Sequence, residues 1–219
     1  SERKLSEKRI QDALQQKDLL LKEVHHRVKN NLQVIHSLLD LQALKMVDTE
    51  LVDVLRDSQN RIRSMSLIHQ TLYQSQNFAQ VDFQRFLSEL LPRLTESYGS
   101  RSRQVRIEIR STEVKLPINE AIPCGLIVNE LVSNALKHGF PNDRSGTVLV
   151  EIRENADQVV ELSISDDGQG IALDKDLGKS ESLGLQLVHL LTRQLHGHLD
   201  VHRSNPTRFT LTFRMGEKS

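Results

Sequence analysis

An apolar stripe at helical spacing constrains the first third of the chain more than any other feature. An α-helix turns by about 100° per residue, so the stripe positions fall mostly on one face of a long helix, with Leu32 and Leu39 beside it: Leu21, Val24, Val28, Ile35, Leu38 and Gln42. His26 lies about 160° from Val24 and from Val28 and faces away from the stripe, whereas His25 lies at its edge. The spacing therefore predicts that His25 packs and that His26 is presented.

A second amphipathic pattern follows the first. The first helix is expected to end near residues 46–48, and Asp48 or Thr49 to cap a second helix whose apolar residues recur as far as Leu72. Two such helices with a short connection predict an antiparallel hairpin. Because one hairpin cannot bury both stripes, pairing two copies into a four-helix bundle is the economical solution. Residues 1–20 continue the helical pattern upstream, either as a solvated lead-in or as a signalling helix from a sensor outside this chain.

The pattern changes near residues 74–80, where we place a domain boundary between a helical domain over 21–77 and a second domain over 78–216. In the second domain we expect helices at 83–98, 117–138 and 183–195, and strands at 105–109, 114–116, 147–153, 159–165, 198–203 and 208–213. Helices and antiparallel-looking strands in this order predict a two-layer α/β sandwich.

The composition excludes several classes of protein. Lys and Arg together number 29, as do Asp and Glu, so no basic block favours nucleic acid binding. The apolar runs are too short to span a bilayer, and the single cysteine, Cys124, fits a reducing compartment. We therefore expect a cytoplasmic module without direct membrane insertion, cut from a longer protein.

Residues 129–139 place polar side chains at helical spacing. Glu130, Asn134, Lys137 and His138 share one helical face at i, i+4, i+7 and i+8. Carboxylate and carboxamide oxygens suit Mg²⁺ and a lysine neutralises phosphate charge, so this face fits a metal-bound polyphosphate. An ordinary solvated face explains this helix equally well when it is taken alone.

Two glycine-containing segments follow. Asp166 ends a strand and begins Asp-Asp-Gly-Gln-Gly, where a fixed carboxylate can accept a hydrogen bond from an exocyclic amine such as that of adenine. Residues 182–187, Ser-Leu-Gly-Leu-Gln-Leu, open a helix whose free amides can bind phosphate. Residues 172–181 between them have the composition of a mobile lid. Taken singly, the first segment is commonly a turn and the second a simple helix cap.

The order and spacing of these segments resemble the N, G1 and G2 boxes of the GHKL ATP-binding superfamily. His-His-Arg-Val-Lys-Asn-Asn-Leu-Gln at 25–33 and Arg-Ile-Arg-Ser-Met-Ser-Leu-Ile-His-Gln-Thr-Leu-Tyr at 61–73 resemble sensor histidine kinases of the HWE-related group, which have the second type of HisKA domain. The resemblance covers about residues 20–213. It implies a helical hairpin for homodimerisation and histidine phosphotransfer, followed by a Bergerat-type α/β sandwich that binds ATP and Mg²⁺.

The resemblance also assigns roles to single positions. His26 matches the phosphoacceptor. Helical spacing, rather than the resemblance, makes Glu23 a candidate to orient the imidazole, because it lies one turn before His26 on the same face. Asn134 matches the Mg²⁺-binding asparagine. Glu130 matches the acidic position that serves other members as a base, and we expect it to help hold metal-bound water.

Further positions match the nucleotide contacts of the family. Asp166 matches the aspartate that reads adenine. The remaining expected ATP contacts are Lys137, His138, Gly168, Gly170, Ser182, Gly184, Leu185 and Thr207. Pro206 stands where the family usually has a glycine before that threonine.

The implied activity is autophosphorylation of His26 by ATP, followed by transfer to an aspartate on the receiver domain of a response regulator. Two alternatives are a GHKL ATPase that forms no phosphohistidine and a degenerate kinase that serves as a dimeric scaffold. The sequence around His26 disfavours the first, and the intact Glu130, Asn134 and Asp166 disfavour the second.

Overall fold

The computed structural model divides the chain into two compact units, residues 1–74 and 75–219. In the second unit it describes residues 80–97, 104–171 and 183–216. In the first unit it describes residues 11, 16, 23, 24, 27, 28, 30–44, 51, 55, 58, 59, 61, 62, 65, 66 and 68. Each unit is considered by itself.

The first unit is helical wherever it is described, apart from a turn at Leu44. Residues 30–43 form one continuous helix, and the Gln59 side-chain amide donates a hydrogen bond to Asp40 Oδ1 at 3.0 Å, which joins the second predicted helix to the first. In the single chain the stripe is largely uncovered, because Leu38 is 56% and Val24 51% exposed. The predicted end of the first helix at 46–48, His25 and His26 all lie outside the described residues.

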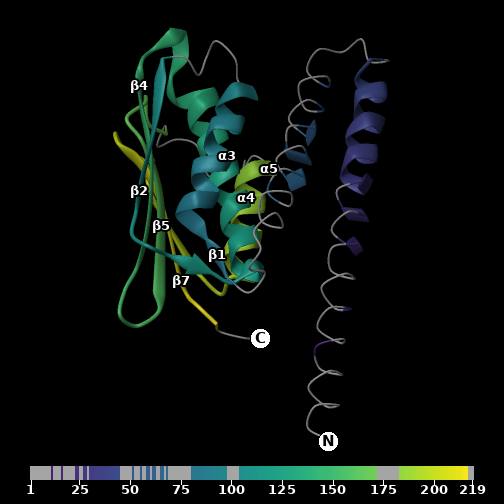
Figure 1. The fold of residues 1–219 in the computed structure, drawn as a ribbon. Helices are drawn as coiled ribbons and strands as arrows, with labels where there is room; N and C mark the ends of the chain where they lie inside the picture. The colour runs from purple at the N-terminus through teal and green to yellow at the C-terminus, as the bar shows by residue number, and fades with distance from the viewer. Residues whose placement is uncertain are drawn as a thin grey trace, which may run out of the picture. The chain divides into compact units, whose positions relative to one another are not determined.

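The second unit contains a five-stranded sheet, which Figure 1 shows edge-on. Its strands stand in the order β2-β4-β5-β7-β6: β2 (Val105–Ser111), β4 (Gly146–Glu154), β5 (Val159–Asp166), β7 (Thr207–Arg214) and β6 (His198–His202). All neighbours are antiparallel except β2 and β4, which are parallel. The expectation of an antiparallel sheet was wrong at this pair. The chain between β2 and β4 contains a long helix, and such a crossover returns the chain in the same direction.

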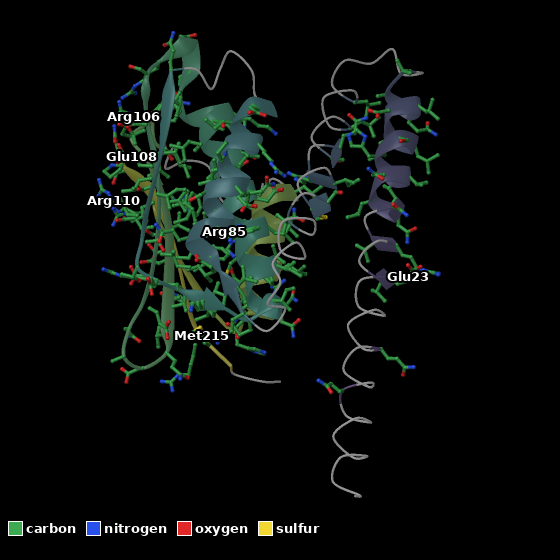
Figure 2. The ribbon with its side chains drawn as sticks, in the orientation of Figure 1. Glu23, Arg85, Arg106, Glu108, Arg110 and Met215 are labelled. Atoms are coloured by element: carbon green, nitrogen blue, oxygen red, sulfur yellow. The ribbon has the colours of Figure 1, made fainter. Side chains whose placement is uncertain are left out.

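Three helices cover one face of this sheet, as Figure 1 shows: α3 (Phe83–Ser97), α4 (Ile118–Asn134) and α5 (Leu183–Gln194). Alternate strand residues such as Val150 and Leu162 point into the resulting core and are fully buried. On the opposite face, Arg106, Glu108 and Arg110 of β2 project away from the helices (Figure 2). The predicted two-layer α/β sandwich is confirmed.

A small second sheet was not predicted. Strand β1 (Val81–Asp82) pairs antiparallel with β3 (Lys115–Leu116), so residues 114–116 do not extend the main sheet. Val81 and Leu116 are both buried, and the Phe83 amide donates to the Val114 carbonyl at 3.1 Å. The pair ties the start of α3 to the segment that leads into α4. Two residues per strand are too few to give a period that is visible in the sequence.

Candidate functional site

Asp166 lies at the end of β5, where two neighbours form hydrogen bonds with its carboxylate. The Gly168 amide donates to Asp166 Oδ1 at 3.0 Å, and the Thr207 hydroxyl forms a hydrogen bond with the same carboxyl group. Thr207 is the direct partner of Asp166 across β5 and β7 and is only 3% exposed. The pairing of two central strands therefore places the threonine beside the aspartate.

Burial raises the pKa of the Asp166 carboxyl above its ordinary value. The Gly168 amide and the Thr207 hydroxyl act in the opposite direction, while the charge of Asp167 raises this pKa further. A carboxylate that burial has partly deprived of water gains more than an exposed one from a new hydrogen-bond donor. The Asp166 carboxylate is therefore well suited to accept a hydrogen bond from the amine of a ligand.

Glycines allow two chain segments to approach closely beside Asp166. A Cβ atom added at Gly168 would collide with the Gly139 carbonyl oxygen and lie 2.6 Å from Asp166 Oδ1. A Cβ atom added at Gly139 would lie 3.1 Å from the same carboxylate oxygen. Gly170 adopts a φ of +80°, in the region that favours glycine. The segment around Asp166 thus lies directly against the end of the helical segment that carries Asn134.

That helical segment does not end as an ordinary α-helix. α4 ends at Asn134, and residues Ala135–Gly139 form a π-helical turn. The expectation of an α-helix as far as residue 138 was wrong by four residues, and Lys137 and His138 lie in the π-turn, which holds one more residue per turn than an α-helix. Glu130 is 3% exposed, Asn134 and Lys137 are half-buried and His138 is exposed. Such turns occur frequently at functional sites.

Two residues that the sequence did not single out fasten the Asp166 segment in place. Asp167 Oδ1 accepts a hydrogen bond from the Thr147 amide at 2.7 Å, at the start of β4. Gln169 donates from its amide to the Gly139 carbonyl and from its side chain to the His138 carbonyl, both at 2.9 Å. The available signal was the polar character of both residues, which flank Gly168, because a flexible turn does not require polar side chains there.

The third predicted segment is only partly described. Gly184 is buried and Leu185 half-buried in the first turn of α5, which begins at Leu183. Ser182 and the predicted lid at 172–181 lie outside the described residues. Among the residues that are described, no group of three or more His, Cys, Asp or Glu is arranged to hold a metal ion. Glu130 and Asn134 carry oxygen atoms one helical turn apart in sequence, and a Mg²⁺ ion held there would need further ligands such as phosphate oxygens.

In the helical unit, Glu23 forms an ion pair with Arg27, its neighbour one turn later. The Arg27 Nε to Glu23 Oε1 distance is 2.8 Å, and both side chains are more than half exposed. The carboxylate suggested for orienting His26 is thus already engaged by a cation. Exposed pairs of this kind contribute little to stability, about 0.3–0.5 kcal/mol, so the carboxylate can be recruited elsewhere.

Comparison with known families follows the same division of the chain. The family described as "Histidine kinase" matches residues 23–98. The family described as "Histidine kinase-, DNA gyrase B-, and HSP90-like ATPase" matches residues 119–217. The two matches occupy the order expected of a sensor histidine kinase. The chain belongs to the sensor histidine kinase family.

Individual relatives agree with this membership. The sensor histidine kinase PdtaS of Mycolicibacterium smegmatis is 33% identical over 97% of this chain and 43% of its own length. The protein of the same name from Mycobacterium tuberculosis is 34% identical over 96% of this chain and 42% of its own length. The chain therefore spans less than half the length of these curated relatives.

A solved structure shares the fold. The histidine kinase domain of the Erythrobacter litoralis blue-light-activated histidine kinase superposes with a TM-score of 0.66, at 21% identity, over 87% of this chain and 96% of that domain. Among the described residues of the present chain, no helix is both long and apolar enough to cross a membrane.

Proposed function

We propose that this chain is the catalytic core of a sensor histidine kinase, which transfers the γ-phosphoryl group of ATP to His26 and then passes it to an aspartate of a response-regulator receiver domain. One observation carries the proposal: a histidine kinase region that includes His26 precedes an ATPase domain in the same chain. The close contact between the Asp166 segment and the end of the Asn134 helix supports a nucleotide site in the second domain.

Two regions of that site would hold opposite ends of ATP. Asp166, with Thr207 beside it, accepts a hydrogen bond from the adenine amine. Asn134 and Glu130 lie where oxygen ligands are needed, with Lys137 and His138 towards the phosphates. Gly168, Gly170, Gly184, Leu185 and Ser182 complete the proposed nucleotide contacts. Bound Mg²⁺ would neutralise phosphate charge, with Glu130 acting through a metal-bound water.

The transfer to His26 needs a neutral imidazole. A free histidine has a pKa near 6.5, so the ring is mostly unprotonated at cellular pH and one nitrogen, Nε2 or Nδ1, can attack the γ-phosphorus. A nitrogen–phosphorus bond forms while the bond to the bridging oxygen of the leaving ADP breaks, and the imidazole passes its remaining ring proton to solvent water. Glu23 is a candidate to orient the imidazole ring, and its carboxylate would have to exchange its ion pair with Arg27 for a hydrogen bond to the ring.

The proposed architecture follows the family. Residues 21–77 form the dimerisation and phosphotransfer domain and residues 78–216 the catalytic domain, with residues 1–20 leading in from a sensor outside this chain. Leu38 and other uncovered side chains of the helical stripe support a homodimer through this domain. ATP and receiver domains are cytoplasmic, so we place the reaction there, without nucleic acid or direct membrane insertion.

The decisive experiment labels the protein with γ-labelled ATP and Mg²⁺ and compares wild type with His26→Ala and His25→Ala. We expect acid-labile, base-stable label in wild type and in His25→Ala, and none in His26→Ala. Loss of label only in His25→Ala would refute the assignment of His26. Transfer of the label to a receiver domain tests the second step.

The same assay separates the two alternatives. ATP hydrolysis by wild type without any protein label would indicate a GHKL ATPase, and failure to bind ATP would indicate a scaffold. Glu23→Gln tests the orienting role, because it removes the charge and retains the shape. An unchanged rate of autophosphorylation in this variant would exclude Glu23.

A further inference from the structure

A nucleotide that occupies this site has to touch two separate structural elements. The proposed adenine acceptor, Asp166, ends β5, whereas the proposed metal ligand, Asn134, ends α4. The affinity for a nucleotide that contacts both elements depends on how well the spacing between the elements is fixed before binding. If the elements become ordered only when the nucleotide binds, the cost of this ordering lowers the affinity. The contact between the two elements is therefore a determinant of binding.

Gln169 makes that contact through two hydrogen bonds. Its backbone amide donates to the carbonyl of Gly139, and its side-chain Nε2 donates to the carbonyl of His138, each at 2.9 Å. These carbonyls belong to the final residues of the π-turn, where a helix end leaves acceptors without partners inside the helix. Gln169 thus caps the helical segment that bears Asn134 from the loop that bears Asp166.

Hydrogen bonds fix the loop that carries Gln169 on both sides of this residue. On one side Asp167 accepts hydrogen bonds from the Thr147 amide at 2.7 Å and, through its carbonyl, from the Arg144 guanidinium at 3.2 Å. On the other side the Ile171 amide donates to the Arg203 carbonyl at 3.0 Å. A change at Gln169 is therefore transmitted to the helix end rather than absorbed by the loop.

We propose that Gln169 is a positioning residue for the nucleotide. Its side-chain amide holds the His138 carbonyl and thereby sets the spacing between Asp166 and Asn134, without touching the nucleotide. The inference rests on the proposed ATP site. It requires a donor at position 169: a carboxylate of the same shape would repel the carbonyl, and a thioether of similar length would leave the carbonyl unbound.

The test uses the whole chain and four variants. Gln169→Met removes the donor at nearly constant shape, Gln169→Glu replaces it with an acceptor, and Gln169→Lys restores a donor. Gln194→Met, at an exposed position in the last turn of α5, is the matched control. Affinities for ATP and for adenosine are measured by displacement of a fluorescent ATP analogue, together with KM and kcat for autophosphorylation.

Adenosine is the informative probe, because it reaches the Asp166 end of the site alone. We expect Gln169→Met and Gln169→Glu to raise the Kd of ATP about three- to tenfold, the effect of one lost hydrogen bond, with a parallel rise in KM and little change in kcat. The Kd of adenosine should change less than twofold. Gln169→Lys should recover most of the ATP affinity, and Gln194→Met should match wild type.

Two results would overturn the positioning role while leaving the ATP site intact. One is wild-type ATP affinity in Gln169→Met and Gln169→Glu, and the other is an equal loss of ATP and adenosine affinity, which would indicate general support of the fold. If wild type binds no ATP at all, the proposed function fails and this inference fails with it.

Discussion

Asp166 and Thr207 face each other as direct partners across β5 and β7, and the threonine hydroxyl forms a hydrogen bond with the aspartate carboxyl. They are separated by forty-one positions in the sequence, including the predicted lid, α5 and β6. The glycine that the family usually has before this threonine is Pro206 here, yet the threonine lies beside the proposed adenine acceptor. The strand pairing, rather than the preceding residue, determines this position.

The first prediction concerns Thr207. Thr207→Val retains the shape but removes the hydroxyl that lowers the pKa of Asp166, so that pKa should rise further. Because the adenine amine needs an ionised acceptor, ATP affinity should fall about three- to tenfold. When the pH is lowered, the variant should lose ATP binding at a higher pH than wild type does. Titrations of ATP binding at several pH values measure both effects. Thr210→Val, on the same strand but half-buried, should behave as wild type.

A second prediction separates stability from function at Asp166. Its pKa is raised in the folded protein, so the folded state holds the proton more tightly than the unfolded state. Stability should therefore fall as the pH rises from the ordinary aspartate range through the raised pKa, and should remain lower above it. Asp166→Asn removes this penalty while retaining an oxygen that can accept from Gly168.

At neutral pH we expect Asp166→Asn to melt at or above the wild-type temperature while ATP affinity drops tenfold or more, because the ionised acceptor is lost. Thermal melts between about pH 4 and about pH 8, combined with ATP titrations, provide the measurement. A melting temperature clearly below that of wild type at neutral pH would show that the carboxylate stabilises the fold instead.

The third prediction concerns Gly168. A Cβ atom there would collide with the Gly139 carbonyl oxygen and crowd Asp166 Oδ1, so Gly168→Ala should destabilise the domain by about 1–3 kcal/mol and weaken ATP binding. Gly216→Ala is the control for steric crowding, because no atom lies within 4 Å of the added carbon. The φ of +76° at Gly216 is the source of strain in this control. Urea unfolding should show the smaller loss at Gly216. A fully stable Gly168→Ala protein would disprove the close approach.

The fourth prediction concerns the uncovered helical stripe. Leu38 is 56% exposed in the single chain, and a second copy is the proposed cover. Leu38→Glu would bury an unpaired charge in that interface, so the dimer dissociation constant should rise tenfold or more. Gln194→Glu adds the same charge at an exposed position of the second unit, outside the helical stripe, and should leave the dimer intact. Sedimentation of both variants over a concentration series gives the result, and a monomeric wild type would contradict the proposal.

Local patterns in the sequence determined most of the element boundaries. The alternation at 159–165 and the helical spacing at 183–195 predicted β5 and α5 to within a residue, because burial of one face imposes a period that neighbouring residues display. Asp166 was identified for the same kind of reason, as an acidic residue where a buried strand gives way to glycines. The apolar stripe around Leu38 likewise indicated a surface in need of a partner.

Tertiary structure alone decided how the site is assembled. Three contacts join segments that are far apart in the chain. They are the parallel pairing of β2 with β4, the burial of Thr207 against Asp166, and the two hydrogen bonds from Gln169 to the π-turn. The sequence pattern predicted an α-helix through residue 138, but residues Ala135–Gly139 form a π-turn. Gln169, thirty residues after Gly139, donates hydrogen bonds to the last two carbonyls of this turn. Periodicity records which face of an element is buried. It does not record which distant residue supplies the hydrogen bond at the end of that element.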